Sequence, residues 1–516
     1  MIGQRILRAA VGSVAVRMVS LLINVFLTPF LVRTLGDTQY GLYVLISSFA
    51  AQGALLDLGM SPAVVKYVAE SQATEDYERG RNTIATALSL YCLLALVVLL
   101  IAAAIAPLFP DLFTVPPPFR EATIVAVLLM GVQLAVSIPM TLPEAILLGS
   151  HRYIPFQALM MLATLLAAAS TVAVLLAGGG IVALFTFSII SMMLPQAISV
   201  WLVRRLEPEL KLGWRGARRN LVKQLLSYSL LTFIIQAAYN VQTQLDEIVI
   251  GVFLPISSVG AYYVARRVSA VPQMISQPIL SAFLPLAAQL NAQKDADGLR
   301  RLYMVGTRAI LAICIPLLIV VVMLAGPLLA LWVGAKFASG ASVVVILALA
   351  SVLEVGYWPG KIILQGIGQQ QDLAKASVFV SIANLGLSVL LVRYYGVAGV
   401  ALGSLIPTIF VNLGYIWPYT MRSVGITGSE LLKQALMPVL IPALPMAALI
   451  YGIMRMTEIS GFILVATVSA TGVTTYAAVY LIFFANAQEM EWLTKAIRQL
   501  STILLFRLNN ARKPLL

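Results

Sequence analysis

Long apolar segments dominate the sequence and constrain its fold more than any other feature. A helix needs about 20 mostly apolar residues to cross a bilayer, and it satisfies its backbone hydrogen bonds internally. About fourteen segments meet this requirement: 11–32, 40–65, 83–107, 122–147, 155–177, 181–203, 228–253, 259–285, 304–325, 342–365, 373–392, 397–419, 436–454 and 461–485. The sequence therefore predicts an all-α polytopic membrane protein with about fourteen transmembrane helices.

The composition excludes several other classes of protein. Hydrophobic residues make up 60% of the chain and charged residues only 11%, whereas soluble domains carry roughly 25% charge. This balance excludes a soluble enzyme, a secreted disulfide scaffold and a nucleic-acid binder, despite a net charge of +13. Cys92 and Cys314 lie in apolar runs, and His151 is the only histidine. Because the chain also has no phosphate-binding loop, we expect no cofactor, no metal centre and no catalytic residue.

Basic residues are divided unevenly between the two sides of the predicted membrane region. If the N-terminus is cytoplasmic, about 25 of the 34 Lys and Arg residues fall in cytoplasmic loops and tails. The outer loops then contain only Arg33, Arg120, Lys336, Arg393 and Arg455. Because cytoplasmic loops carry an excess of Lys and Arg, we expect both termini to be cytoplasmic.

The chain also contains an internal repeat. Its longest basic loop follows the sixth apolar segment and reads RRLEPELKLGWRGARRNLVKQ. On either side of this loop, YGLYVLISSFAA (40–51) overlays VGAYYVARRVSA (259–270), and EAILLG (144–149) overlays KIILQG (361–366). Transporters commonly have such repeats, with the substrate site between them. We therefore expect two pseudo-symmetric six-helix lobes around a central cavity, a further helix pair and a tail: lobe 1–205, cytoplasmic loop 206–222, lobe 223–435, helix pair 436–485 and cytoplasmic amphipathic tail 486–516.

Nine ionisable residues lie inside the predicted membrane segments. They are the cations Arg17, Arg266, Arg267 and Lys361 and the acids Asp57, Glu144, Asp246, Glu247 and Glu354. A central Arg or Lys costs about 2.5–3.5 kcal/mol on insertion scales. These residues must therefore reach the headgroups, pair with opposite charges or line a water-filled cavity.

The four cations favour a substrate with an anionic group. Arginine presents a planar fork of donors that matches phosphate oxygens, so Arg17, Arg266, Arg267 and Lys361 are the predicted substrate-binding residues. Arg17 lies near the inner end of its helix, where it could line the cavity or reach the headgroups instead. Adjacent residues on a helix point about 100° apart. We therefore expect only one of Arg266 and Arg267 to face the cavity, and the other to pair or lie at a helix interface.

The acids suggest ion coupling or gating. A carboxylate in a poorly hydrated site can take up and release a proton or coordinate Na⁺ during transport, a role open to Asp57, Asp246 and Glu354. The alternative is that these acids only neutralise the cations. Glu144 and Lys361 occupy equivalent positions in the repeat and have opposite charges. They therefore form a candidate gate pair between the lobes.

Two sequence motifs at the starts of the lobes resemble the polysaccharide transporter family of the multidrug/oligosaccharidyl-lipid/polysaccharide exporter superfamily. The motifs are FLTPFLVRTLGDTQYGLYVLISSFAAQGALLDLGMSPAVVKYVAE and QLDEIVIGVFLPISSVGAYYVARRVSA, and YYGVAGVALGSLIP resembles the twelfth helix of the family. The resemblance implies two six-helix lobes that alternate between inward-open and outward-open states. It also implies a flippase that moves undecaprenyl-pyrophosphate-linked oligosaccharide units, such as those of O-antigen, to the outer leaflet.

The resemblance further implies the partners and the location of the protein. The partners are the undecaprenyl-pyrophosphate-linked glycan and membrane lipid, with a polysaccharide polymerase and chain-length machinery as further candidates. We expect a monomer in a bacterial or archaeal plasma membrane, with transport coupled to a proton or sodium gradient. The related lipid II flippases bind the diphosphate through arginines of the first and eighth helices, which here are Arg17 and Arg266 or Arg267. Their lipid-tail groove corresponds here to residues 437–484.

Three alternatives remain at this point. A multidrug and toxin extrusion antiporter would share the lobes, but it has twelve helices and a cavity suited to organic cations. A lipid II flippase would share the helix count, but this chain has fewer basic residues in its first two segments. A membrane polysaccharide polymerase would be an enzyme with a large outer loop, whereas the outer loops predicted here are short and contain no histidine.

Overall fold

The structure is a computed structural model. It describes residues 2–210, 212–214, 216–218, 220–223, 225, 233, 237, 240, 244–280 and 283–485. The predicted amphipathic tail over 486–516 lies outside the described residues, as does half of the predicted segment over 228–253. All regular elements in the described ranges are helical, which confirms the all-α prediction.

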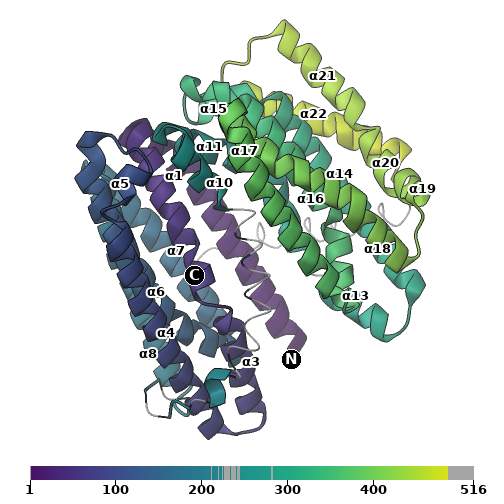
Figure 1. Cartoon of the computed structure of the whole chain (residues 1–516). Helices are drawn as coiled ribbons and strands as arrows, with labels where there is room; N and C mark the ends of the chain where they lie inside the picture. The colour runs from purple at the N-terminus through teal and green to yellow at the C-terminus, as the bar shows by residue number, and fades with distance from the viewer. Residues whose placement is uncertain are drawn as a thin grey trace, which may run out of the picture.

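The N-terminal half forms one bundle of long helices, drawn in purple and blue in Figure 1. Asp76 begins α4 by accepting a hydrogen bond from the Arg79 backbone N–H at 3.0 Å, as N-cap residues do. The elements are α1 (Ile2–Ala51), α2 (Gly53–Leu56), α3 (Met60–Ala73), α4 (Tyr77–Ile105), α5 (Phe109–Leu112), a 3₁₀ helix η1 (Pro117–Phe119), α6 (Arg120–Gly149), α7 (Tyr153–Leu176) and α8 (Ile181–Leu206).

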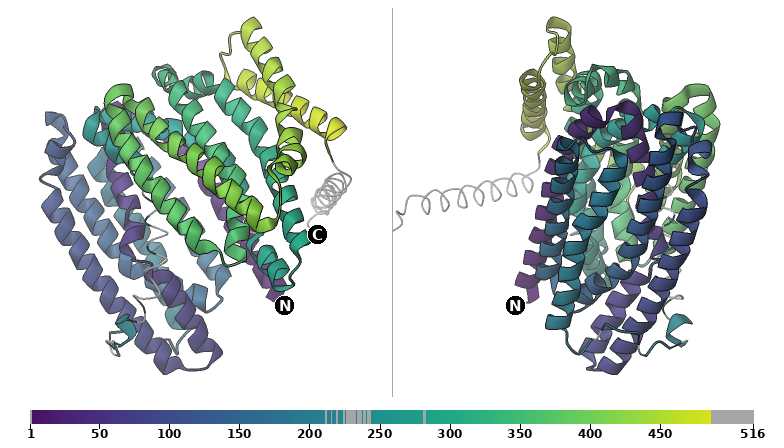
Figure 2. Two further views of the ribbon diagram at one scale, coloured as in Figure 1. Left: turned by 45° about the vertical axis from the view of Figure 1, so that its right-hand side comes forward. Right: turned by 90° about the vertical axis from the view of Figure 1, so that its left-hand side faces the viewer.

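The second half forms another bundle, with a peripheral pair of helices at its edge (Figure 2). Its first helices are α10 (Asp246–Phe253), α11 (Ile256–Ser269), α12 (Val271–Leu280), α13 (Phe283–Ala292), α14 (Ala296–Met323) and α15 (Ala325–Trp332). They are followed by η2 (Ala335–Gly340), α16 (Ala341–Gly366), α17 (Gln370–Val411), the π-helix η3 (Asn412–Ile416) and α18 (Trp417–Val424). The last elements are α19 (Gly428–Leu431), the π-helix η4 (Leu432–Leu436), α20 (Met437–Leu440), α21 (Ala443–Met456) and α22 (Phe462–Phe483).

Glycine breaks divide the two longest helices. At 1.5 Å per residue, the 50 residues of α1 would extend about 75 Å if straight, far more than the roughly 30 Å of a bilayer core. Gly36 in α1 and Gly396 in α17 have φ values of 72° and 57°, which residues other than glycine rarely adopt. Each of these helices therefore contains two of the predicted segments. In the described residues, ten helices are long and apolar enough to cross a membrane, so this count does not reproduce fourteen.

Two predicted segments are not continuous helices. The segment over 259–285 is divided among α11, α12 and α13, and α12 begins with Val271 and Pro272, whose ring has no N–H to continue the preceding helix. The segment over 40–65 is interrupted after Ala51 and again before α3, where Leu58 and Gly59 have positive φ. A run of apolar residues predicts that a segment lies within the membrane, but it does not show where a helix in that segment breaks.

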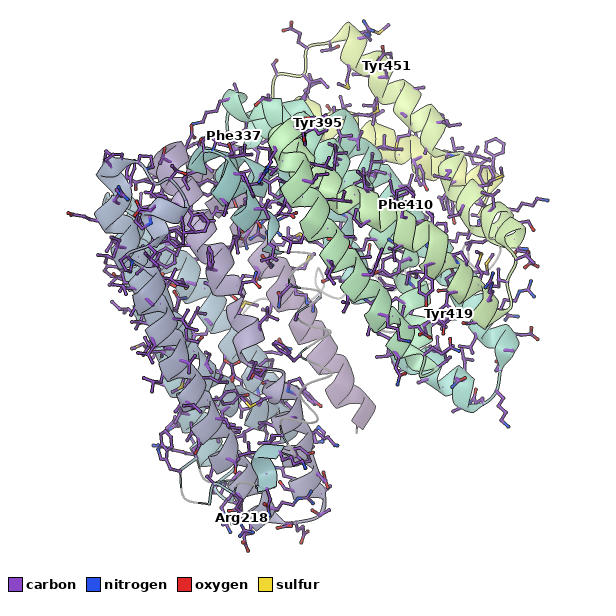
Figure 3. All side chains as sticks on the ribbon, viewed as in Figure 1. Arg218, Phe337, Tyr395, Phe410, Tyr419 and Tyr451 are labelled. Atoms are coloured by element: carbon purple, nitrogen blue, oxygen red, sulfur yellow. The ribbon has the colours of Figure 1, made fainter. Side chains whose placement is uncertain are left out.

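The two bundles meet at one end of the molecule and diverge toward the other (Figure 1). The largest hydrophobic core includes fully buried residues of both halves, such as Leu45 of α1, Ile250 of α10 and Val344 of α16. At this joined end the Lys336 ammonium pairs with Asp37 Oδ1 at 2.5 Å, and Trp332 Nε1 donates to the Val25 carbonyl at 2.7 Å. Figure 3 shows Phe337 at the joined end and Arg218 at the far end of the N-terminal bundle.

Candidate functional site

A cavity of about 550 Å³ lies between α1 of the N-terminal bundle and helices α10, α11, α12, α16 and α17. Apolar side chains such as Val44, Met274 and Leu347 form part of its wall. Its polar lining consists of Tyr43, Ser47, Ser48, Gln244, Asp246, Tyr263, Arg266, Arg267, Ser269, Gln273, Gln277, Ser351, Glu354, Ser404 and Thr408. A mixed apolar and polar lining of this size is typical of a small-molecule binding site.

Arg266 lines the cavity but already has a buried counter-ion. Its Nη2 lies 2.7 Å from Oε1 of Glu247, whose side chain is 0% exposed. A charge buried without a partner is costly, whereas a close pair compensates for much of the desolvation. The charge of Arg266 is therefore largely neutralised by Glu247, which lies on α10, the helix packed beside α11.

Arg267 also lines the cavity, but its contacts are different. Its Nε donates to the Tyr263 hydroxyl at 3.0 Å, and its guanidinium lies 4.9 Å from the centre of the Tyr263 ring. The described residues place no carboxylate within ion-pair distance of Arg267. Both arginines line the cavity, so the prediction that only one of them faces it is wrong, whereas the pairing expected of the other is found between Arg266 and Glu247.

Asp246 joins three helices through a buried hydrogen-bond network. Tyr262 of α11 donates to its Oδ2, and the Ser404 hydroxyl of α17 donates to the same oxygen at 3.2 Å. Asn384 in turn donates to Ser404 at 2.8 Å, while its own carbonyl oxygen is buried without a hydrogen-bond partner among the described residues. The aspartate is therefore held by neutral donors, and Ser404 links it to Asn384.

Glu354 and Lys361 lie two turns apart on the same face of α16. Glu354 lines the cavity and accepts a hydrogen bond from Gln273 of α12 at 2.9 Å. Lys361 lies outside the main cavity, in a small adjacent hollow that also includes Thr408 and Asn412. The expected cluster of four cavity cations is thus reduced to the two arginines of α11, with Lys361 beside the cavity.

Arg17 lies at the edge of the cavity. Its side chain is exposed, and Nη1 donates to the Gln277 side-chain oxygen at 3.2 Å, a contact between α1 and α12. Gln277 is itself part of the cavity lining. This position is compatible with both roles predicted for Arg17, lining the cavity and reaching the headgroups, because the guanidinium is near the cavity and also exposed.

Asp57 and Glu144 do not line the cavity. Asp57 accepts hydrogen bonds from Tyr91 Oη at 2.6 Å and from the Ser61 backbone N–H at 3.0 Å, so it supports the break before α3. Glu144 lies on α6 in the N-terminal bundle, and no ion pair between it and Lys361 is present in the described part of the chain. Coupling by Asp57 and gating by the Glu144–Lys361 pair remain predictions.

The sequence pattern of the family described as polysaccharide biosynthesis protein matches residues 30–342, which is more than half of the chain. The chain belongs to this family. The match confirms the resemblance found in the lobe motifs, and it extends from within α1 to just beyond η2.

Curated relatives of this polysaccharide biosynthesis protein are distant. The probable low-salt glycan biosynthesis flippase Agl15 of Haloferax volcanii is 25% identical over 35% of this chain and 39% of its own length. The chain therefore spans less than half of that relative in the match. The uncharacterized membrane protein EpsK of Bacillus subtilis is 22% identical over 82% of this chain and 84% of its own length.

Solved structures show that this family member has the fold of the MOP superfamily. The lipid II flippase MurJ in an inward closed conformation aligns with a TM-score of 0.73 at 14% identity, over 92% of this chain and 98% of that one. An inward-facing multidrug resistance MATE family transporter aligns with a TM-score of 0.68 at 15% identity, over 82% and 99%. At these identities the similarity shows the fold alone: a multi-pass, all-α transporter architecture.

Sequence reasoning assigned no role to several residues of this site. The sequence shows Glu247 only as a charge within a segment, although a buried arginine needs a counter-ion and the DE pair begins α10, the helix before the one that contains Arg266. Gln273 and Gln277 carry no charge and match no motif, and Tyr263 lies within the second lobe motif but has no charge that would single it out. Only the packing of α11 and α12 against α1 and α16 shows that they contact the ionisable residues.

Proposed function

We propose that this polysaccharide biosynthesis protein is a flippase for undecaprenyl-pyrophosphate-linked oligosaccharides, working by alternating access rather than as an enzyme. The observation that carries the proposal is Arg267, a cavity arginine whose partner is a tyrosine and which has no carboxylate partner among the residues that the structure describes. Its donors can therefore bind a phosphate group through charge-assisted hydrogen bonds. The family, the transporter fold and the flippase names of the relatives support the same function.

The proposed direction of transport depends on which end of the molecule faces the cytoplasm, and the charges of the loops indicate that end. The bundles meet at the end where Lys336 and Asp37 pair, and Lys336 belongs to the outer set in the topology predicted from basic residues. The other end of the N-terminal bundle contains α3 and the start of α4, which bear Lys66, Arg79 and Arg81. This state is therefore inward-facing, with both termini at the cytoplasmic side of the plasma membrane. The head group enters from the cytoplasm, and the prenyl tail stays in the bilayer or along α21 and α22.

In this mechanism the pyrophosphate lies between Arg267 and Arg17, while Arg266 stays paired with Glu247 and contributes less. Arg17 exchanges its bond to Gln277 for a phosphate oxygen, which is a stronger, charge-assisted acceptor. Closure of the cytoplasmic side and separation of the outer contacts then present the glycan to the outer leaflet.

Replacement of Arg267 by glutamine is expected to reduce flipping about tenfold or more, because a hydrogen bond to a charged group contributes about 1.5–3 kcal/mol. The measurement is leaflet exchange of a panel of undecaprenyl-pyrophosphate-linked oligosaccharides in reconstituted vesicles. Arg393→Gln is the matched control, since Arg393 also stacks on an aromatic ring, that of Phe253, but lies outside the cavity. Full activity of the Arg267 variant would contradict the anion site.

A cation antiporter is the second candidate, because Asp246 and Glu354 also line the cavity. The same vesicles distinguish the two functions. A wild-type protein that exports ethidium and moves no lipid-linked glycan is an antiporter, and the proposed function is then wrong.

Asp246 is the proposed coupling residue for the cation gradient. Its carboxylate, the Ser404 hydroxyl and the Asn384 carbonyl, which has no hydrogen-bond partner in the described part of the chain, are oxygen atoms of the kind that bind Na⁺ or relay protons in transporters. An imposed Na⁺ or pH gradient is expected to accelerate flipping by the wild type and to leave the rate of Asp246→Asn unchanged. Equal acceleration of both proteins would exclude this residue as the coupling site.

A further inference from the structure

The internal repeat places serines at the positions equivalent to the cavity arginines. When YGLYVLISSFAA overlays VGAYYVARRVSA, Ser47 and Ser48 of α1 fall on Arg266 and Arg267 of α11. All four side chains line the same cavity. The two repeat helices also approach closely, because a Cβ at Gly260 would lie 2.7 Å from the Tyr40 ring and 3.5 Å from the Gly41 nitrogen. The repeat thus builds a cavity with one cationic wall and one hydroxyl-bearing wall.

The hydroxyl-bearing wall has capacity for further hydrogen bonds. Ser48 is buried, at 4% exposure, and its hydroxyl donates to the Val44 carbonyl at 2.9 Å, which leaves its oxygen able to accept. Ser47 and Tyr43 add hydroxyls that both donate and accept. Uncharged hydroxyls cannot compete with arginine for a phosphate, but they match the donors and acceptors of sugar hydroxyls.

The wall formed by α11 and α12 also has hydroxyls, those of Tyr263 and Ser269, but the Tyr263 hydroxyl already accepts a hydrogen bond from Arg267, and both glutamines of this wall have partners. Gln273 is bonded to Glu354 at 2.9 Å, and Gln277 to Arg17 at 3.2 Å. Both amides therefore position charged side chains. A sugar linked to a phosphate held on α11 must lie within one sugar's reach of that phosphate, and α1 is the helix that faces it across the cavity.

We propose that Tyr43, Ser47 and Ser48 form a sugar subsite that binds the first hexose of the substrate while Arg267 holds the pyrophosphate. This inference rests on the proposed function and adds the orientation of the head group. The glycan is directed toward α1 and the phosphates toward α11, so the two halves of the repeat bind different parts of one molecule.

Two probes test this subsite in phosphatidylcholine nanodiscs: undecaprenyl pyrophosphate, and undecaprenyl pyrophosphate that carries a single N-acetylhexosamine. The wild type should bind the glycosylated probe more tightly. The double variant S47A/S48A should bind it about tenfold more weakly than the wild type, as expected for the loss of two hydrogen bonds, with unchanged affinity for the bare pyrophosphate. Arg267→Gln should weaken binding of both probes.

Ser170→Ala is the matched control, since Ser170 also donates to a carbonyl of its own helix, that of Ala167 at 2.9 Å, but lies outside the cavity. It should bind both probes like the wild type. A double serine variant that keeps wild-type affinity for the glycosylated probe, or loses affinity for both probes equally, would overturn the sugar subsite alone. A wild type that binds neither probe would overturn the proposed function and the subsite with it.

Discussion

Arg266→Met is expected to lower the free energy of unfolding by about 3–5 kcal/mol. The cause is Glu247, which is fully buried and has Arg266 as its ion-pair partner at 2.7 Å. Removal of the guanidinium would leave a fully buried carboxylate beside Asp246, without its ion-pair partner Arg266, at the junction of the two bundles. The measurement is the thermal unfolding midpoint of the purified protein in detergent.

The double variant with Glu247→Gln separates this charge effect from a loss of packing. Because it removes both charges, it should recover most of the lost stability. Arg267→Met is the control on the neighbouring position, since Arg267 contacts Tyr263 and no carboxylate in the described ranges. Its unfolding midpoint should stay near that of the wild type. A double variant as unstable as Arg266→Met would show that the ion pair is not the cause.

Gly41→Ala is expected to open the joined end of the molecule. A Cβ at this position would lie 2.2 Å from the Ile256 carbonyl oxygen, and this atom belongs to the backbone, so no rotamer change relieves the clash. Overpacking of this kind costs about 1–3 kcal/mol, which corresponds to a shift of about 5- to 150-fold in a two-state equilibrium. The joined state should therefore lose population to a state in which α1 and α11 have separated.

Cysteine cross-linking measures this shift. Cysteines replace Asp37 and Lys336, whose side chains pair at 2.5 Å, in a background in which Cys92 and Cys314 are alanine. Disulfide formation should be several-fold slower in Gly41→Ala than in the parent. Gly386→Ala is the control, because a Cβ there would meet no atom within 4 Å. An unchanged cross-linking rate in Gly41→Ala would mean that the contact does not hold this end together.

The contents of the cavity were only partly predictable. Because a charged side chain is costly inside a membrane, Arg266, Arg267, Asp246 and Glu354 stand out in the sequence as unusual. All four line the cavity. The same rule also marked Asp57 and Glu144, which lie elsewhere in the N-terminal bundle. Burial cost identifies a residue that needs polar surroundings, but it does not say whether those surroundings are a cavity or, as for Asp57, a tyrosine and a backbone N–H.

The lengths of the apolar segments and the distribution of charge along the sequence are enough to predict a multi-pass helical membrane protein. The reason is that each segment must be apolar enough to insert into lipid on its own, whatever the other segments contain. The repeat and the lobe motifs indicated the family. Only the tertiary structure decided which charges meet. The packing of α1, α10 and α11 decides that Arg266 pairs with Glu247, that Arg267 has no carboxylate partner among the described residues, and that Ser47 and Ser48 line the same cavity. Such contacts between separate helices leave no periodic signal in the sequence, since each helix needs only to be apolar enough to insert.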